Sequence, residues 1–205
     1  MSSDAGRDPE ELLDRARAGG GLALGQLLEL YRSYLALLAR VQIGRRLQGK
    51  VDAADLVQDT FLEAHRHFAE FRGVTEAELV CWLRQILAGL LGNLVRRYLG
   101  TQRRDVRLER ELGDELDRSS RALDQNLAAR QSTPSQRAAR REQAVLLADA
   151  LGRLPDDYRE VIILHHLEGL TFPEVARRSG RTVDSLKNVW ARALGQLRRS
   201  LGCSL

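Results

Sequence analysis

The chain has 205 residues, of which 43% are hydrophobic, 29% charged and 5% aromatic, with a net charge of +4. This composition, rich in Leu, Ala and Arg, predicts one or two helical domains that bury a core. The two cysteines exclude a disulfide scaffold or a zinc finger. The polar N-terminus and the lack of an apolar run of ~18 residues predict a cytoplasmic chain with no secretion signal and no membrane insertion.

Helical periodicity dominates, and strand signals are nearly absent. The first periodic stretch, 22–48, predicts a helix or a helix pair, broken near Gly44 and Gly49. A second helix, 52–71, is predicted to have two faces. Its core seam comprises Ala54, Val57, Phe61, Ala64, Phe68 and Phe71, and its far side carries Asp52, Asp55, Leu56, Asp59, Leu62 and Glu63. Leucines exposed among carboxylates suggest a docking face for a basic partner, although a solvated acidic face would share this charge pattern.

A third helix, 78–99, follows a turn around Gly73. Its apolar residues from Leu83 to Tyr98 recur at helical spacing and predict one continuous core stripe. The opposite face carries Arg84, Gln85, Ala88, Gly89, Gly92, Asn93, Arg96 and Arg97. Small residues there would let a nucleic-acid backbone approach, with the arginines holding phosphates. Packing of the glycines against a neighbouring helix explains them equally well.

Between Asp105 and Gln136 the apolar residues thin out, which predicts a flexible linker. The expected fold class is therefore all-α, with two helical domains joined by that linker. The predicted boundaries are 8–102 for the first domain, 103–135 for the linker and 136–202 for the second domain.

The C-terminal segment predicts a helix-turn-helix. Thr171 and Glu174 have capping-box spacing, a short helix ends at Gly180, and a longer helix runs from about Thr182 to Ser200. The second helix is expected to bury Val183, Leu186, Val189, Trp190, Ala193, Leu194 and Leu197. Its other face shows Asp184, Ser185, Lys187, Asn188, Ala191 and Arg192, which are residue types that reach bases and phosphates in a major groove. A plain antiparallel helix pair is the alternative.

Basic side chains are concentrated in two blocks, 84–110 and 169–202, which suggests two contacts with polyanions. No catalytic constellation accompanies them. His65 and His67 would point about 200° apart on a helix, and no acid or thiol clusters with His165 and His166. The sequence therefore predicts no enzyme, no metal site and no cofactor.

Several of these motifs together resemble the extracytoplasmic-function (ECF) subfamily of sigma-70 RNA polymerase sigma factors. Region two of that family is similar to Asp52-Ala-Ala-Asp55-Leu-Val-Gln58-Asp59-Thr-Phe61, Phe71-Arg-Gly73, Trp82-Leu-Arg-Gln-Ile86 and Arg96-Arg97. Region four is similar to Leu154-Pro155, Tyr158-Arg-Glu-Val161, Leu167-Glu-Gly169 and the helix-turn-helix. The match is collinear over nearly the whole chain. The ending Trp190-Ala-Arg192-Ala-Leu194 resembles the branch common in planctomycetes.

The resemblance implies a bacterial protein that binds core RNA polymerase, through the β′ coiled-coil and the β flap, and promoter DNA. The residues implied in polymerase docking are Asp52, Asp55, Leu56, Gln58 and Asp59. Those implied in −10 recognition and melting are Phe71, Arg72, Asn93, Arg96 and Arg97, with the loop from Phe71 to Glu78 capturing a flipped base. Those implied in −35 recognition are Arg181, Ser185, Lys187, Asn188 and Arg192. Whether an anti-sigma factor, phosphorylation or expression level controls activity stays open.

Two other functions are compatible with parts of the pattern. A repressor or activator would use the helix-turn-helix alone, usually as a dimer on an operator. A helical adaptor would bind only protein and would show no salt-dependent affinity for DNA. The acidic helix and the long polar segment argue against the first alternative.

Overall fold

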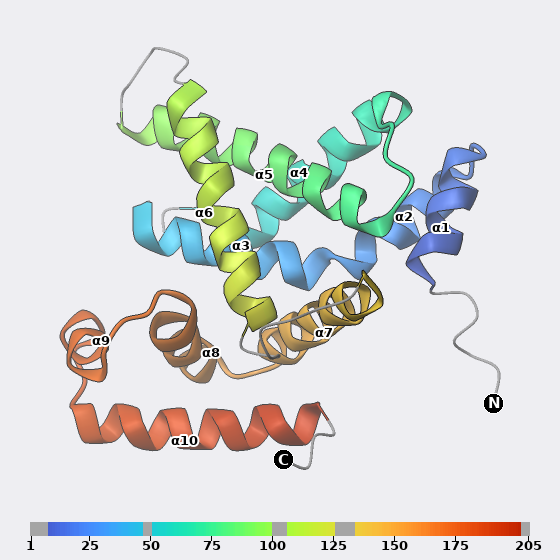
Figure 1. Cartoon of the computed structure of the whole chain (residues 1–205). Coiled ribbons are helices and arrows are strands. Elements are labelled where there is room, and N and C mark those ends of the chain that lie inside the picture. Colours follow the sequence, from blue (N-terminus) through green and yellow to red (C-terminus); the bar gives the residue numbers. More distant parts are fainter. Residues whose placement is uncertain (1–7, 47–50, 100–105, 126–133, 202–205) are drawn as a thin grey trace. The chain divides into compact units, whose positions relative to one another are not determined.

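The computed structural model describes residues 8–46, 51–99, 106–125 and 134–201. These residues form helices joined by short turns, with no strand in the part of the chain that is described (Figure 1). The chain divides into two compact units, Met1–Arg118 and Ser119–Leu205. The predicted all-α class is confirmed, and each unit is described separately below.

The first unit opens with three helices, α1 (Pro9–Arg17), α2 (Gly21–Leu30) and α3 (Arg32–Arg46). Asp8 starts α1 because its side chain accepts a hydrogen bond from the Glu10 backbone N–H at 3.0 Å. The predicted single stretch over 22–48 is therefore two helices, and the break lies at Tyr31 rather than near Gly44.

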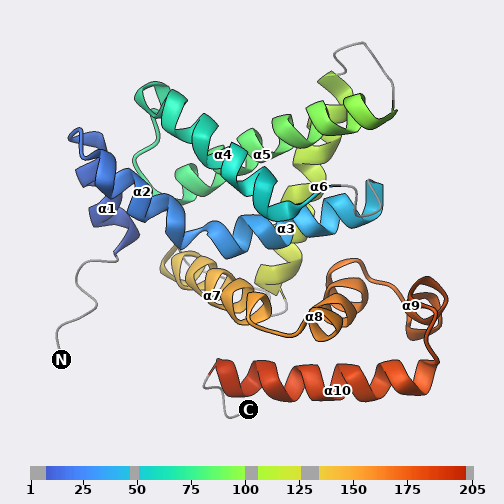
Figure 2. The same ribbon diagram turned by 180° about the vertical axis from the view of Figure 1, so that it is seen from behind.

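The next two helices complete the core of the first unit. They are α4 (Ala53–His67), which is followed by the short 3₁₀ turn η1 (Phe68–Glu70), and α5 (Glu76–Leu99). Helix α5 packs against α1, α3 and α4, as Figure 2 shows from behind for α3 and α4. Of the predicted core stripe, Leu83, Leu87, Leu91 and Val95 are almost fully buried, whereas Ile86, Leu90 and Leu94 are only partly buried. Tyr98, at the end of that stripe, is instead 48% exposed.

Helix α5 also departs from the expectation about apolar runs. Its Glu76–Tyr98 portion is long and apolar enough to cross a membrane by length and composition, and it is the one such helix in the described ranges. Its apolar stripe lies in the core of the first unit. A central helix surrounded by other helices needs that same composition.

The predicted flexible linker is wrong over residues 106–125, which form helix α6 (Val106–Gln125). Its leucines at 112 and 116 are fully buried. The polar composition that suggested a linker is that of a strongly amphipathic helix. A few leucines on one face are enough to anchor such a helix to the core. Residues 134 and 135, also predicted as linker, open the next described helix, Pro134–Gly152, and positions 103–105 and 126–133 lie outside the described residues.

The second unit contains α7 (Pro134–Gly152), α8 (Asp156–Ile162), one π-helical turn η2 (Ile163–Leu167), α9 (Phe172–Ser179) and α10 (Val183–Ser200). Its core joins Val161, Leu164, Val175 and Leu186, and Phe172 and Trp190 pack at the margin. Helix α10 contacts α7, α8 and α9 (Figure 1), so the other three α-helices of the unit all pack against it.

Candidate nucleic-acid interface

Helix α4 presents an acidic strip made of Asp55, Gln58, Asp59 and Leu62. All four side chains are exposed, and their spacing of three, four and seven residues places them on one face of the helix. Asp52 has a different task, because its Oδ1 accepts the Ala54 backbone N–H at 2.9 Å and caps the start of α4. The strip can therefore meet a basic partner while Asp52 holds the first turn.

Leu56 does not belong to this strip. It is 1% exposed and packs into the core, whereas Ala54, predicted as core, is exposed. The true seam runs through Ala53, Leu56, Val57, Thr60 and Ala64: it shares Val57 and Ala64 with the predicted seam, but Ala53 and Thr60 take the places of Ala54 and Phe61. The prediction of Leu56 as a docking residue is therefore wrong as far as direct contact is concerned.

The loop after α4 is held in one shape by aromatic stacking. The Phe71 ring lies 4.9 Å from the Trp82 ring and 6.0 Å from the Phe68 ring, centroid to centroid. A Cβ on Gly73 would lie 2.3 Å from the Phe71 ring, so the backbone can pass here only as glycine. Phe71 is thus half-buried, and its neighbour Arg72 is exposed.

Glu78 completes the loop, a role that was not predicted from the sequence. Its Oε2 accepts hydrogen bonds from the Val74 N–H at 2.8 Å, the Thr75 N–H at 3.0 Å and the Thr75 hydroxyl at 2.9 Å. These bonds, the one from Val74 first, lower the pKa of the Glu78 carboxyl. The Thr75-x-x-Glu78 spacing is a capping box and could have revealed this start of α5.

The polar face of α5 is only partly open. Asn93 and Arg97 are exposed, as the predicted nucleic-acid contacts require. The Arg96 side chain is only 13% exposed, because Glu109 of α6 binds it at 3.0 Å and it also donates to the Asn93 amide oxygen. Arg96 is therefore engaged within the first unit and is not an open phosphate contact.

The helix-turn-helix is formed by α9 and α10, as predicted. Glu174 accepts hydrogen bonds from the Thr171 N–H at 2.7 Å and from its hydroxyl at 2.6 Å, which completes the capping box. Gly180 ends α9 in the left-handed region with φ 66°, a conformation that favours glycine. Thr182 then caps α10 through the Ser185 N–H at 3.3 Å.

The outer face of α10 is exposed at each predicted −35 position on the helix, Ser185, Lys187, Asn188 and Arg192. Arg181, just before α10, is also exposed, and its guanidinium lies 3.7 Å from the Asp157 carboxylate. Such a pair is weak at a surface, so Arg181 can exchange this partner for a phosphate.

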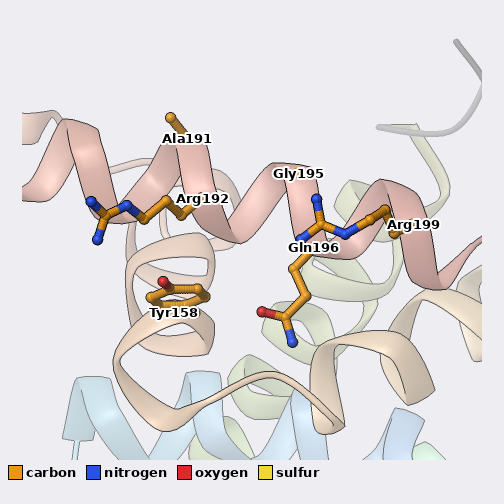
Figure 3. Close-up of a pocket in the computed structure, with 6 residues that line it drawn as sticks. All are labelled: Tyr158, Ala191, Arg192, Gly195, Gln196 and Arg199. Atoms are coloured by element: carbon orange, nitrogen blue, oxygen red, sulfur yellow. The ribbon is translucent and has the colours of Figure 1, made fainter.

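A pocket lies between Tyr158 of α8 and the C-terminal half of α10, beside the contact between these two helices. Its lining includes Tyr158 of α8 together with Arg192, Gln196 and Arg199 of α10 (Figure 3). In Figure 3 the Arg192 side chain lies on the side of α10 that faces Tyr158, whereas Ala191 points away. Arg192 therefore stands at the edge between the exposed face of α10 and this pocket.

A histidine–aromatic cluster joins η2 to the helix-turn-helix. The His165 ring stacks on Phe172 with 4.3 Å between centroids, and the Trp190 indole N–H donates to His166 Nε2 at 2.9 Å. Desolvation, assisted by the neighbouring His165, lowers the pKa of His166 below its ordinary 6.5. The folded second unit therefore favours neutral His166, which can accept the Trp190 hydrogen bond.

We expect the second unit to lose stability as the pH falls through the ordinary histidine pKa of 6.5. Because His166 has a lower pKa folded than unfolded, the unfolded chain takes up its proton first, and the stabilisation is complete only above about pH 7. In a Trp82→Phe background, the fluorescence of Trp190 during urea unfolding reports this unit. His166→Gln should make the pH dependence shallower, whereas His65→Gln in α4 should not change it. Equal slopes in the wild type and His166→Gln would contradict the assignment.

No cluster of three or more His, Cys, Asp or Glu side chains that could hold a metal occurs within the described ranges. The features that stand out are instead the acidic strip on α4, the stacked loop, the partly covered face of α5 and the exposed face of α10. The first three lie in one unit and the last in the other.

Comparison with known proteins finds a family match within each of the two units. Residues 30–104 match the family described as Sigma-70 region 2, and residues 144–197 match Sigma-70, region 4. The chain is 30% identical over 191 residues to the ECF RNA polymerase sigma factor BldN of Streptomyces coelicolor, covering 93% of this chain and 65% of that relative. It is 27% identical to the ECF RNA polymerase sigma-E factor of Haemophilus influenzae, covering 82% of this chain and 81% of the relative. It is 28% identical to SigM of Mycobacterium tuberculosis, covering 96% and 86%.

Among solved structures, the chain is similar to CnrH in its complex with the cytosolic domain of CnrY. That match has 26% sequence identity and a TM-score of 0.35, and it covers 97% of this chain and 100% of the other. A second match, to the RsbN–BldN complex, has 26% identity and a TM-score of 0.32, and it covers 91% and 97%.

Proposed function

We propose, from the premise that this chain belongs to the ECF subfamily of sigma-70 RNA polymerase sigma factors, a division of labour between its two units in transcription initiation. The first unit docks on core RNA polymerase and engages the −10 element. The second unit recognises the −35 element. As a factor that acts on the polymerase and on chromosomal DNA, the chain is assigned to the cytoplasm.

The acidic strip on α4 is the proposed docking surface for the basic β′ coiled-coil of the polymerase. Asp55 and Asp59 supply charge, Gln58 supplies hydrogen bonds, and Leu62, which is 54% exposed, supplies apolar area. Complementary charge steers association, and an apolar side chain within a polar rim adds burial. Leu56 supports this surface from below by anchoring α4 in the core.

The stacked loop and the open part of α5 are the proposed −10 contacts. A flipped base needs an aromatic surface for stacking and a rigid pocket wall, and Phe71, fixed against Trp82, offers both. Arg72 and Arg97 are exposed and can pair with phosphates, while Asn93 has an amide suited to a base edge.

The exposed face of α10 is the proposed −35 reader. Ser185, Lys187 and Asn188 lie on the first two turns of α10, the part of a recognition helix that reaches base edges in the major groove. Arg192 is one turn further along and can reach a base or a phosphate. The β flap is the proposed partner for the rest of the second unit.

The observation that carries this proposal is that one chain combines the acidic strip on α4 with a capped helix-turn-helix. An operator-binding regulator needs only the second feature. The test is co-elution of the purified chain with core RNA polymerase, followed by run-off transcription from a library with randomised −35 and −10 elements. Co-elution and selection of one sequence pair would support the proposal. A chain that neither binds core polymerase nor supports a transcript would overturn it.

Arg192→Ala is expected to weaken −35 recognition by about 1–3 kcal/mol if Arg192 contacts a base, and by less if it contacts only phosphate. The measurement is holoenzyme affinity for the selected promoter and for variants with single −35 changes. A base contact predicts relaxed discrimination at one position, whereas a phosphate contact predicts uniform weakening. Arg153→Ala is the control, because it removes the same charge from an exposed position outside the helix-turn-helix. Equal effects of the two variants would contradict the role of Arg192.

A further inference from the structure

Helix α6 lies against the face of α5 that the proposed function assigns to the −10 element. The two helices come close at Gly92, where an added Cβ would lie 3.1 Å from Cγ of Glu109 and 3.7 Å from Cδ1 of Leu112. Leu112 is fully buried. The small residue that could admit a nucleic-acid backbone instead admits a segment of the same chain.

Two ion pairs tie α6 to this side of the first unit. Glu109 Oε1 lies 3.0 Å from Arg96 Nη1, and Asp117 Oδ1 lies 2.8 Å from Arg84 Nε. The two arginine side chains are only 13% and 18% exposed, respectively. Arg84 also donates to the Tyr34 hydroxyl at 3.1 Å. Carboxylates thus occupy guanidinium groups that would otherwise be available to phosphates.

The rest of the same face remains open, since Asn93 and Arg97 are exposed. The acidic contacts therefore cover part of the face and leave an edge on which a nucleic acid can first land. The carboxylate partners Glu109 and Asp117 are 28% and 47% exposed, so solvent and salt reach both ion pairs and a polyanion carrying several phosphates can compete for the arginines. The occupant is held in the same chain, so it competes at a high effective concentration.

We propose that α6 is an intramolecular mask of the −10 surface, with Glu109 and Asp117 acting as stand-ins for DNA phosphates. DNA binding then requires α6 to leave Gly92, Arg84 and Arg96, which lowers the affinity of the free chain for nucleic acid. Binding to the polymerase or to DNA shifts the population toward the unmasked state. This inference rests on the proposed function of the first unit.

The test compares two double variants of equal charge. Glu109→Gln with Asp117→Asn removes the two mask carboxylates. Glu111→Gln with Asp114→Asn removes two exposed carboxylates from the same helix. The probe is a labelled single-stranded DNA of mixed sequence, followed by fluorescence anisotropy at fixed salt. The mask variant should bind about fivefold or more tightly than the wild type, and well beyond the control variant. If both variants gained the same affinity for DNA, the change in net charge would explain the effect, and the mask would be overturned.

Adding Arg97→Ala to the mask variant tests whether its higher affinity for DNA comes from the exposed face of α5. If the mask variant binds through the uncovered face, this third change should remove most of its advantage while lowering wild-type binding less. An advantage that survives Arg97→Ala would overturn the assignment to this face. Circular dichroism of each variant verifies that the helices persist. Should the mask variant lose helix, Leu112→Asp, which unseats α6 by removing its buried leucine and changes no residue of α5, repeats the comparison.

Hydrogen exchange on the full-length wild-type chain supplies an independent readout. Backbone amides of residues 108–118 should exchange faster when the DNA probe is bound, because α6 leaves its seat. Unchanged or slower exchange would overturn the mask while leaving sigma-factor activity intact. Failure of every variant to bind both core polymerase and DNA would instead overturn the proposed function, and the mask with it.

Discussion

Asp55→Arg is expected to reduce binding to core RNA polymerase by about a hundredfold or more. The side chain is exposed in the middle of the acidic strip, so reversal of its charge places two cations face to face across the proposed interface. The fold should tolerate the change, because the lost interaction with the helix N-terminus costs no more than about 1 kcal/mol. The measurement is the dissociation constant for core polymerase, together with the yield of run-off transcript.

Asp14→Arg on α1 is the matched control, because it makes the same change of charge at another exposed position of the first unit. It should leave polymerase binding within about threefold of the wild type. Leu56→Ala tests the corrected register of α4. It should weaken binding by destabilising the first unit, with an earlier unfolding transition that Asp55→Arg lacks. An Asp55→Arg protein that still binds core polymerase would show that the docking surface lies elsewhere.

Leu186→Ala should unfold most of the second unit. Leu186 is fully buried and packs in one core with Val161, Leu164 and Val175, which come from α8, η2 and α9. Removal of a buried leucine side chain costs about 2–5 kcal/mol, a large part of the stability of a small helical domain. We therefore expect loss of −35-dependent transcription, while binding of the first unit to core polymerase persists.

Leu146→Ala makes the same chemical change in the same unit at a side chain that is 52% exposed. It should cost less than about 1 kcal/mol, because little apolar area leaves water there on folding. Trp190 fluorescence in a Trp82→Phe background follows unfolding of the second unit in both variants. Similar unfolding midpoints for Leu186→Ala and Leu146→Ala would contradict the assigned core.

The helix-turn-helix was predictable because its signals are local. The capping pair Thr171 and Glu174 and the glycine at 180 each act within a few residues of their own position. The face of α10 followed from the same logic, since helical spacing alone separates Leu186 and Ala193 from Lys187 and Asn188.

Burial and pairing between distant segments were not predictable in this way. Leu56 was misplaced because a seam beginning at Ala53 and one beginning at Ala54 differ by a single position, and only packing of α4 against α3 and α5 chooses between them. Arg96 looked open because its partner, Glu109, belongs to a stretch that was expected to be a linker. Helix α6 is anchored by only a few leucines, so its composition is as polar as that of a linker and composition alone cannot distinguish the two.

The fit of Gly73 against Phe71 bears on how the loop proposed to capture a flipped base could be re-engineered. A side chain at position 73 would strike the Phe71 ring on one side and, at 2.8 Å, the Cβ of Glu78 on the other. A change at position 73 would therefore displace both the Phe71 ring and the first turn of α5, so the two must be redesigned together. Attempts to retarget this factor to a different downstream base would have to redesign residues 71–78 as one block.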